Sequence, residues 1–113
     1  MKKIKLLTLL LLAHFSLLAQ NKFTIDGRVM DKGQPVEFAN VTLSRISDST
    51  KVAFITVTDT LGKFRFNKIE KNEFIIRFTM LGYQTSSQRV VVNGQSDVIN
   101  LGDIYLKPNN QLL

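Results

Sequence analysis

The residues with the clearest chemical potential lie in one short stretch, TVTDTLGKFRF, at positions 56–66. Asp59 stands there between two threonine hydroxyls, and these oxygens could begin a site for a metal or a substrate. A calcium site usually needs two or more carboxylates close in sequence, and the nearest other acids are Asp48 and Glu70. A tight turn needs only an aspartate at its first position and a glycine at its fourth, which Asp59 and Gly62 supply. The stretch therefore predicts a turn between two strands rather than a binding site.

Residue types that commonly carry enzyme chemistry are scarce in this chain. It has no cysteine and no tryptophan, and its one histidine, His14, lies near the N-terminus. The rest of the chain therefore lacks residues for histidine-assisted nucleophilic catalysis, histidine acid–base catalysis and ordinary zinc ligation. Carboxylates such as Asp59 and Glu70 stay open as a catalytic pair, although no spacing visibly arranges two of them together. We expect a protein that is not an enzyme and that has no catalytic, cofactor-binding or metal-binding residues.

The first 19 residues have the pattern of a cleavable signal peptide. Lys2, Lys3 and Lys5 precede a short apolar run, and Ala19 stands at a plausible cleavage position. A retained membrane anchor is the alternative, but a spanning helix needs about 20 mostly apolar residues and this run is shorter and contains His14. The absence of cysteine also excludes a lipid-anchored N-terminal cysteine. We therefore expect an exported protein.

Cleavage changes the charge and size that matter for function. Three of the 15 lysines and arginines leave with the leader, so 12 face 9 acids and the mature net charge is +3. That charge is ordinary for a soluble surface and does not indicate nucleic-acid binding. The remaining length suits one small domain, which without disulfides must be held together by its apolar core alone.

Apolar and polar residues alternate along the mature chain with a period of two. This periodicity predicts half-buried strands, and we count about seven of them at a spacing of roughly 8–12 residues, with no helix. The fold class is therefore an all-β, seven-stranded antiparallel β-sandwich that follows the signal peptide. The inward positions are Phe23, Ile25, Gly27 and Val29, then Ala39, Val41 and Leu43, then Phe64 and Phe66, and finally Phe74, Ile76 and Phe78.

Turns are indicated where glycine, proline, asparagine and aspartate cluster. In DKGQP we expect Gly33 to supply the positive φ, and in LGYQT we expect Gly82 to break the strand. The pair Asn93–Gly94 is a strong signal for a β-hairpin between the strands that flank it. None of these glycines precedes a predicted helix, so none indicates a phosphate-binding loop.

Two sets of side chains share the predicted strands. The aromatic set could form a stacking platform for bases or sugars, but its period of two favours a place in the core. The basic set alternates with it and indicates solvated faces. The aromatic set is Phe64, Phe66, Phe74, Phe78 and Tyr83, and the basic set is Lys63, Arg65, Arg77 and Arg89.

Three motifs taken together resemble the carboxypeptidase regulatory-like domain. The pattern G-x-V-x-D…G-x-P-x-x-x-A-x-V-x-L begins at Gly27 and ends at Leu43. The pattern T-D-x-x-G-x-F-x-F begins at Thr58 and ends at Phe66, and F-x-x-x-G-Y ends at Tyr83. The combination is closest to the version at the N-terminus of outer-membrane β-barrel receptors, including TonB-dependent ones, in Bacteroidetes-type bacteria.

This resemblance covers residues 23–106 and implies a transthyretin-like sandwich without catalytic residues of its own. In such receptors the domain lies on the periplasmic side of the outer membrane and precedes a plug and a membrane barrel, which a chain of 113 residues cannot contain. We therefore divide the chain into a signal peptide (1–19), a carboxypeptidase regulatory-like β-sandwich (20–107), and a C-terminal tail or start of a linker (108–113).

The resemblance implies a non-catalytic module in the periplasm or on the periplasmic face of the outer membrane. It would be an accessory or interaction domain of an outer-membrane receptor, or a fragment from one, with an envelope protein as partner. No cofactor and no nucleic acid is expected. The alternative is a small carbohydrate-binding or adhesion module of the cell envelope. Its candidate glycan-contacting aromatics are Tyr83, Tyr105 and Phe54.

Overall fold

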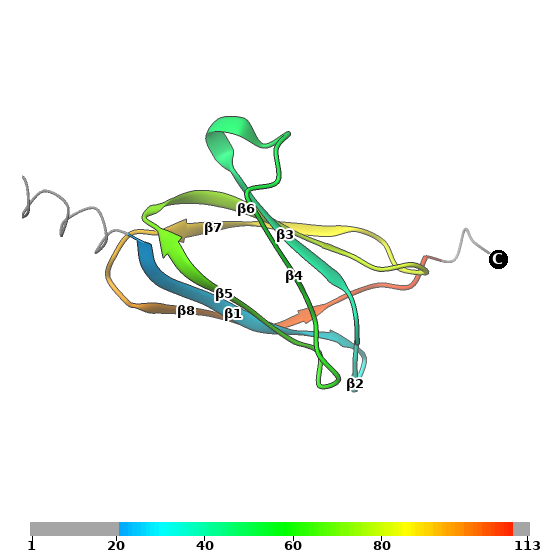
Figure 1. Ribbon diagram of the computed structural model, residues 1–113. Helices are drawn as coiled ribbons and strands as arrows, with labels where there is room; N and C mark the ends of the chain where they lie inside the picture. Colours follow the sequence, from blue (N-terminus) through cyan, green and yellow to red (C-terminus); the bar gives the residue numbers. More distant parts are fainter. Residues whose placement is uncertain (1–20, 110–113) are drawn as a thin grey trace, which may run out of the picture.

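The strands expected from the period of two form two sheets that face each other (Figure 1). The structure is a computed structural model that describes residues 21–109. The first sheet contains β1 (Asn21–Asp31), β2 (Gln34–Pro35), β5 (Lys63–Glu70) and β8 (Val98–Tyr105). The second contains β3 (Asn40–Arg45), β4 (Phe54–Val57), β6 (Asn72–Thr79) and β7 (Ser86–Val92). A short 3₁₀ turn, η1 (Ile46–Asp48), follows β3.

This architecture confirms the predicted all-β sandwich, with one pairing that differs from the expected antiparallel pattern. In the second sheet the order is β4-β3-β6-β7, and every pair is antiparallel. In the first sheet β1 pairs antiparallel with β2 and β5 but parallel with β8. The parallel pairing arises because the chain crosses from β7 in one sheet to β8 in the other.

The core lies between the sheets. It includes the apolar residues predicted to face inward and also residues that were not predicted, among them Ile69, Val90 and Ile104. Alternate side chains of β1, β3, β5 and β6 are buried, as the period of two requires. The rings of Phe64 and Phe78 meet edge to face with centroids 5.4 Å apart, and this contact joins the two sheets. Burial of each such large apolar side chain contributes about 1.5–3 kcal/mol.

Gly27 is an inward-facing position of β1. The ring of Phe64 occupies the space that a side chain at this position would fill. A Cβ atom at Gly27 would come within 2.7 Å of the Phe64 ring and 3.1 Å of the Gly102 carbonyl oxygen. Phe64 is the strand partner of Gly27 in β5 and is itself buried. A glycine at this inward position therefore makes room for a neighbouring aromatic ring.

Two turn predictions from sequence were wrong in detail. In the β1–β2 hairpin the positive φ belongs to Lys32 (φ 51°) and not to Gly33. Asn93 and Gly94 do form a turn, in which the Asn93 side chain accepts a hydrogen bond from Gln95 N. They do not close a hairpin, because β7 pairs with β6 whereas β8 pairs with β1. The same local signal thus serves a crossover between sheets.

Gly82 lies in the turn that follows β6, where the strand ends as predicted, and it has φ 89°. The segment after β8 is bound to this turn, because Gln84 N donates to Lys107 O and Asn109 N donates to Gly82 O. The predicted signal peptide and residues 110–113 lie outside the described residues. Within 21–109 no helix is long and apolar enough to cross a membrane.

Candidate functional site

The Asp59 stretch forms the turn between β4 and β5 that its sequence predicted. Gly62 N donates to the Asp59 carbonyl oxygen at 3.0 Å, which closes a four-residue turn, and Gly62 has φ 77°. The Asp59 carboxylate accepts hydrogen bonds from Leu61 N and Lys63 N, both at 2.9 Å. Its Oδ1 therefore holds two backbone amides of the turn in place.

Thr58, the hydroxyl residue next to Asp59, is buried and has its own structural role. Its Oγ1 donates to Val36 O at 2.7 Å and accepts from Ala39 N at 2.8 Å. Its backbone N also donates to Ala39 O at 3.0 Å. This side chain attaches the segment between β2 and β3 to the end of β4, and it is not directed at a ligand.

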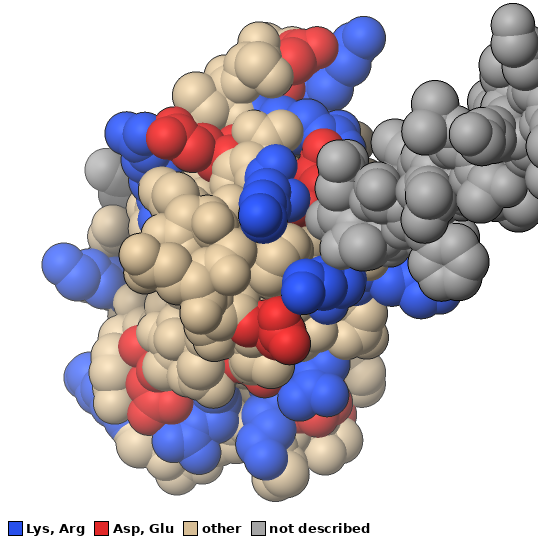
Figure 2. All heavy atoms as spheres, turned by 90° about the vertical axis from the view of Figure 1, so that its left-hand side faces the viewer, with Lys and Arg blue, Asp and Glu red and all other residues tan. Residues whose placement is uncertain are grey.

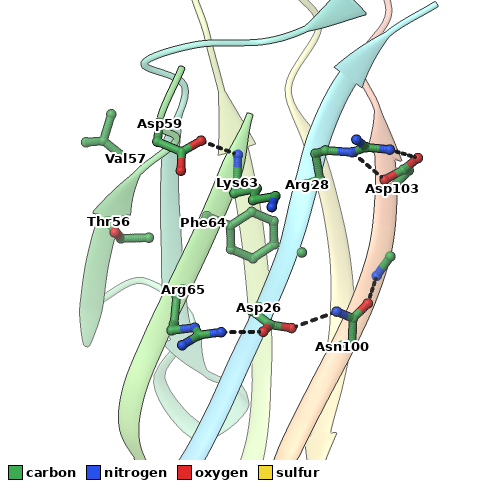
Figure 3. Close-up of a pocket in the computed structure, with 12 residues that line it drawn as sticks. Asp26, Arg28, Thr56, Val57, Asp59, Lys63, Phe64, Arg65, Asn100 and Asp103 are labelled. Carbon is green, nitrogen blue, oxygen red and sulfur yellow. Dashed lines mark hydrogen bonds and ion pairs between the residues drawn. The ribbon is translucent and has the colours of Figure 1, made fainter. Parts of the chain in front are cut away.

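A groove of about 580 Å³ lies over the outer face of β1, β5 and β8 (Figure 3). Thr56 and Val57 of β4 border it on one side, and Asp103 of β8 borders it on the other. The turn residue Asp59 lies at its edge next to Lys63. The groove could not be predicted from sequence, because β1, the β4–β5 segment and β8 are distant from one another in the chain.

The charged side chains of the groove interact with one another across neighbouring strands. Arg65 Nη2 contacts Asp26 Oδ2 at 3.3 Å, and Asp26 Oδ1 accepts from Asn100 Nδ2 at 2.9 Å. Asn100 Oδ1 in turn accepts from Gly102 N at 2.8 Å. This series runs across β5, β1 and β8, as the dashed lines in Figure 3 show, and it links the three strands across the groove floor.

Arg28 and Asp103 form the second lateral pair of the groove. Arg28 Nε and Nη2 each donate to a different Asp103 oxygen at 2.9 Å, which is the bidentate geometry that strengthens such pairs. Hydrogen bonding by Arg28 lowers the pKa of the Asp103 carboxyl, and the same bond raises the pKa of Arg28. The pair is thus ionised throughout the physiological pH range.

The two carboxylates considered as a catalytic pair are not brought together. Asp59 lies in the turn before β5, whereas Glu70 is the last residue of β5 and pairs with Arg45. Within residues 21–109 there is no group of three or more histidine, cysteine, aspartate or glutamate side chains placed to hold a metal ion. The sequence candidates therefore do not converge on one point.

The four phenylalanines of the aromatic set are buried, as predicted, and the other aromatic residues differ in exposure. Phe54 packs edge to face on Phe74 with centroids 6.3 Å apart. Tyr83 is half-buried and its hydroxyl donates to Asp31 at 2.8 Å, which raises the pKa of Tyr83. Tyr105 is 60% exposed. Phe38 is 65% exposed and has φ 63°. It could not be predicted from sequence, because no period of two marks residues in a loop.

The basic set lies on the outer faces of the sheets, as expected. Arg89 pairs with Glu73 on the adjacent strand, and Arg77 donates to the Ser49 carbonyl oxygen. On the face shown in Figure 2, lysine and arginine side chains are interspersed with aspartate and glutamate. That face therefore carries no extended patch of one sign.

The fold and this outer surface define a small β-sandwich domain with a polar groove on one sheet. The family model of the carboxypeptidase regulatory-like domain matches residues 24–107, and the chain belongs to this family. No curated relative matches the chain.

Solved structures with a similar fold come from several functional classes. They share 14–15% sequence identity with this chain, so the likeness concerns the fold alone. The group B streptococcus pilus 2b backbone protein has a TM-score of 0.62 over 80% of this chain, which spans 43% of that protein. A putative carbohydrate binding protein from Pseudomonas aeruginosa has a TM-score of 0.57, over 76% of this chain and 88% of that one. The 5-hydroxyisourate hydrolase of Klebsiella pneumoniae has a TM-score of 0.55, over 78% and 94%.

Proposed function

We propose that this protein is a non-catalytic interaction module of the bacterial envelope that serves an outer-membrane receptor of the TonB-dependent type. The observation that supports the proposal is that charged side chains of the groove pair with one another. Arg28 is engaged by Asp103, and Arg65 is engaged by Asp26, so these groups stabilise the sheet surface instead of converging on a reacting atom. A stable surface of this kind suits docking.

Membership of the carboxypeptidase regulatory-like family supports the same proposal, together with the signal-peptide pattern of residues 1–19. The domain acts on the periplasmic side, where it contacts the receptor or its plug through strand edges and loops. It needs no cofactor and no nucleic acid for this role.

Fractionation of the cells that make the protein tests the proposal. An antibody raised against residues 23–106 should detect its antigen with the outer membrane, either as a larger polypeptide or as a band near 10 kDa. The smaller band should be released from the membrane by salt or mild detergent. Antigen confined to the cytoplasm, or free in the growth medium, would contradict the proposal.

A second candidate function, glycan binding, is favoured by one specific observation. Tyr105 is 60% exposed on β8 next to the Arg28–Asp103 pair, whose planar groups lie on the same sheet face. An exposed aromatic ring beside fixed polar groups is a common arrangement for stacking a sugar. Of the three aromatics predicted from sequence, Tyr105 alone combines exposure with a place beside this groove.

Labelled envelope polysaccharides test this candidate. Retention that is lost in Tyr105→Ala and kept in Tyr83→Phe would support glycan binding, because Tyr83 serves as the matched tyrosine whose hydroxyl is engaged within the fold. Equal retention by Tyr105→Ala and the unchanged protein would exclude Tyr105 as the contact.

A further inference from the structure

β4 is an edge strand whose outer side has no partner strand in the described structure. It lies at the end of the sheet order β4-β3-β6-β7 and pairs with β3 alone. Its exposed residues are Ile55, 67% exposed, and Val57, 47% exposed. Two apolar side chains therefore accompany this free edge.

The hydrogen-bond phase of the β3–β4 pair shows which amides point outward. Thr58 N donates to Ala39 O, and these two residues are in register with the rest of the pair. Since hydrogen-bonded and non-hydrogen-bonded pairs alternate in an antiparallel ladder, Thr56 bonds to β3 whereas Ile55 and Val57 direct their N–H and C=O groups to the free edge. The exposed apolar residues and the free backbone groups thus belong to the same two positions.

The other edge strands of the sandwich carry protection that β4 lacks. β5 presents Lys63 and Arg65, β7 presents Arg89, and β8 contains Asp103 and pairs with β1 through a register shift. Charges and irregularities of this kind prevent unwanted strand pairing. β4 consists of FITV and has no charged side chain.

Two further exposed apolar residues extend this surface. Phe38 N donates to Thr58 O, so Phe38 lies beside the end of β4. Leu61 is 57% exposed in the turn that follows. Phe38 also has φ 63°, a conformation that is costly for a bulky residue and that often marks functional positions. We call Phe38, Ile55, Val57 and Leu61 the β4 edge surface.

The groove supplies space and a charge along the same edge. Thr56 and Val57 line it on the β4 side, and Lys63 lies across from them on β5. Lys63 forms no ion pair with any residue between 21 and 109, in contrast to Arg28 and Arg65 in the same groove. A negative charge on a bound segment would complement it.

We propose that the β4 edge surface binds an extended segment of a partner protein by strand addition. The segment alternates apolar residues, which lie beside Ile55 and Val57, with acidic residues, one of which pairs with Lys63. Main-chain hydrogen bonds to β4 give affinity, and the alternating side chains give specificity. This inference rests on the proposed interaction function and names the surface and the chemistry of the partner.

A second copy of the chain fits this surface less well. Two β4 strands of four residues each would form few hydrogen bonds and bury a small area, below the roughly 1,000 Å² that a specific interface needs. The second copy would also bring its own Lys63 to the edge in place of an acid. An extended segment can follow the edge past β4 to Phe38 and Leu61.

Amide hydrogen exchange with a defined probe tests the inference. The probe is a synthetic peptide of about ten residues that alternates valine and glutamate, a length that covers β4 and its turn. A peptide of the same composition in blocks of valine and of glutamate is the control. We expect the alternating peptide to slow exchange at Ile55 and Val57 at least tenfold, and the block peptide to leave it unchanged. Unchanged exchange at both residues under saturating alternating peptide overturns the inference, as does protection confined to β7 or β8.

Matched variants separate the edge from the rest of the surface. Ile55→Lys should weaken peptide binding at least tenfold, whereas Val91→Lys, at an exposed valine on the opposite edge strand of the same sheet, should leave it unchanged. Ile55→Pro removes an outward N–H without loss of a β3 hydrogen bond, and should abolish binding while the protein stays folded. Equal effects of Ile55→Lys and Val91→Lys would overturn the role of β4.

Phe38→Gly supplies a readout that a merely structural role would not show. Glycine relieves the positive φ, so the unfolding midpoint should rise while peptide binding falls. Unchanged peptide binding in this variant would contradict the assignment of Phe38 to the binding surface. If Ile55→Lys leaves outer-membrane association intact, the edge inference fails and the proposed function stands; if the unchanged protein never associates, the proposed function itself fails.

Discussion

Thr58 and Ala39 are joined by two hydrogen bonds, one from Thr58 N to the Ala39 carbonyl oxygen and one from Ala39 N to Thr58 Oγ1. The second bond places a side-chain hydroxyl where a strand partner would normally offer a carbonyl. The same hydroxyl donates to Val36 O, so one buried threonine determines how the β2–β3 segment joins β4.

Thr58→Val should therefore destabilise the fold although it preserves shape. The Ala39 amide and the Val36 carbonyl would lose their buried partner, at a cost of about 1–3 kcal/mol. Urea unfolding of the purified domain measures the loss. Thr60→Val, at the exposed residue two positions on, is the control and should stay within about 0.5 kcal/mol of the unchanged protein. Similar stabilities for both variants would show that the Thr58 bonds contribute nothing.

Gly62→Ala should be far more damaging than Gly33→Ala. Gly62 has φ 77° and a Cβ there would lie 2.4 Å from the Val29 carbonyl oxygen, whereas a Cβ at Gly33 meets nothing within 4 Å. The left-handed conformation alone costs an alanine about 1–2 kcal/mol, and the backbone clash adds to it. Thermal unfolding compares the two variants. A stable Gly62→Ala would mean that the β4–β5 turn can take another form.

Tyr83 should titrate above the ordinary tyrosine value of about 10. Its hydroxyl donates to the Asp31 carboxylate, which favours the protonated phenol and raises its pKa. A raised folded pKa means that the stabilising effect is fully present below about pH 10 and is lost as the pH rises through the folded value. The stability gap between the unchanged protein and Tyr83→Phe should thus shrink in strong alkali. NMR titration of the Tyr83 ring gives the pKa directly, and a value at or below 10 would refute this account.

Asp103 should titrate below the ordinary aspartate value of about 3.9, because Arg28 donates two hydrogen bonds to its ionised form. A lowered folded pKa means that the stabilising effect is present above the ordinary value and is lost as the pH falls through the folded one. Asp103→Asn should therefore differ most from the unchanged protein near neutral pH and least in strong acid. Added salt should reduce the difference, since the pair is open to solvent. A gap that widens in acid would contradict the prediction.

Local pattern was sufficient for part of this structure. The period of two predicted which side chains face the core, because successive residues of a strand point to opposite sides wherever the strand is placed. Asp59 and Gly62 predicted their turn because its hydrogen bonds lie within five residues. In both cases the deciding interactions join residues that are close in the sequence.

Other features were decided by contacts between distant parts of the chain. Asn93–Gly94 has the letters of a hairpin, yet β8 leaves β7 and pairs with β1, where it completes the first sheet. Arg28 meets Asp103 only because that pairing brings them side by side.

The sequence by itself determined the sandwich class and the absence of cysteine, and with them the dependence of the described domain on an apolar core. Only the tertiary structure decided that β8 runs parallel to β1, that the groove's charges pair laterally, and that β4 is left as an uncharged edge. The physical reason is that alternation specifies the face of each residue, whereas the choice of neighbouring strands depends on which edges stay free once both sheets have closed over the same core.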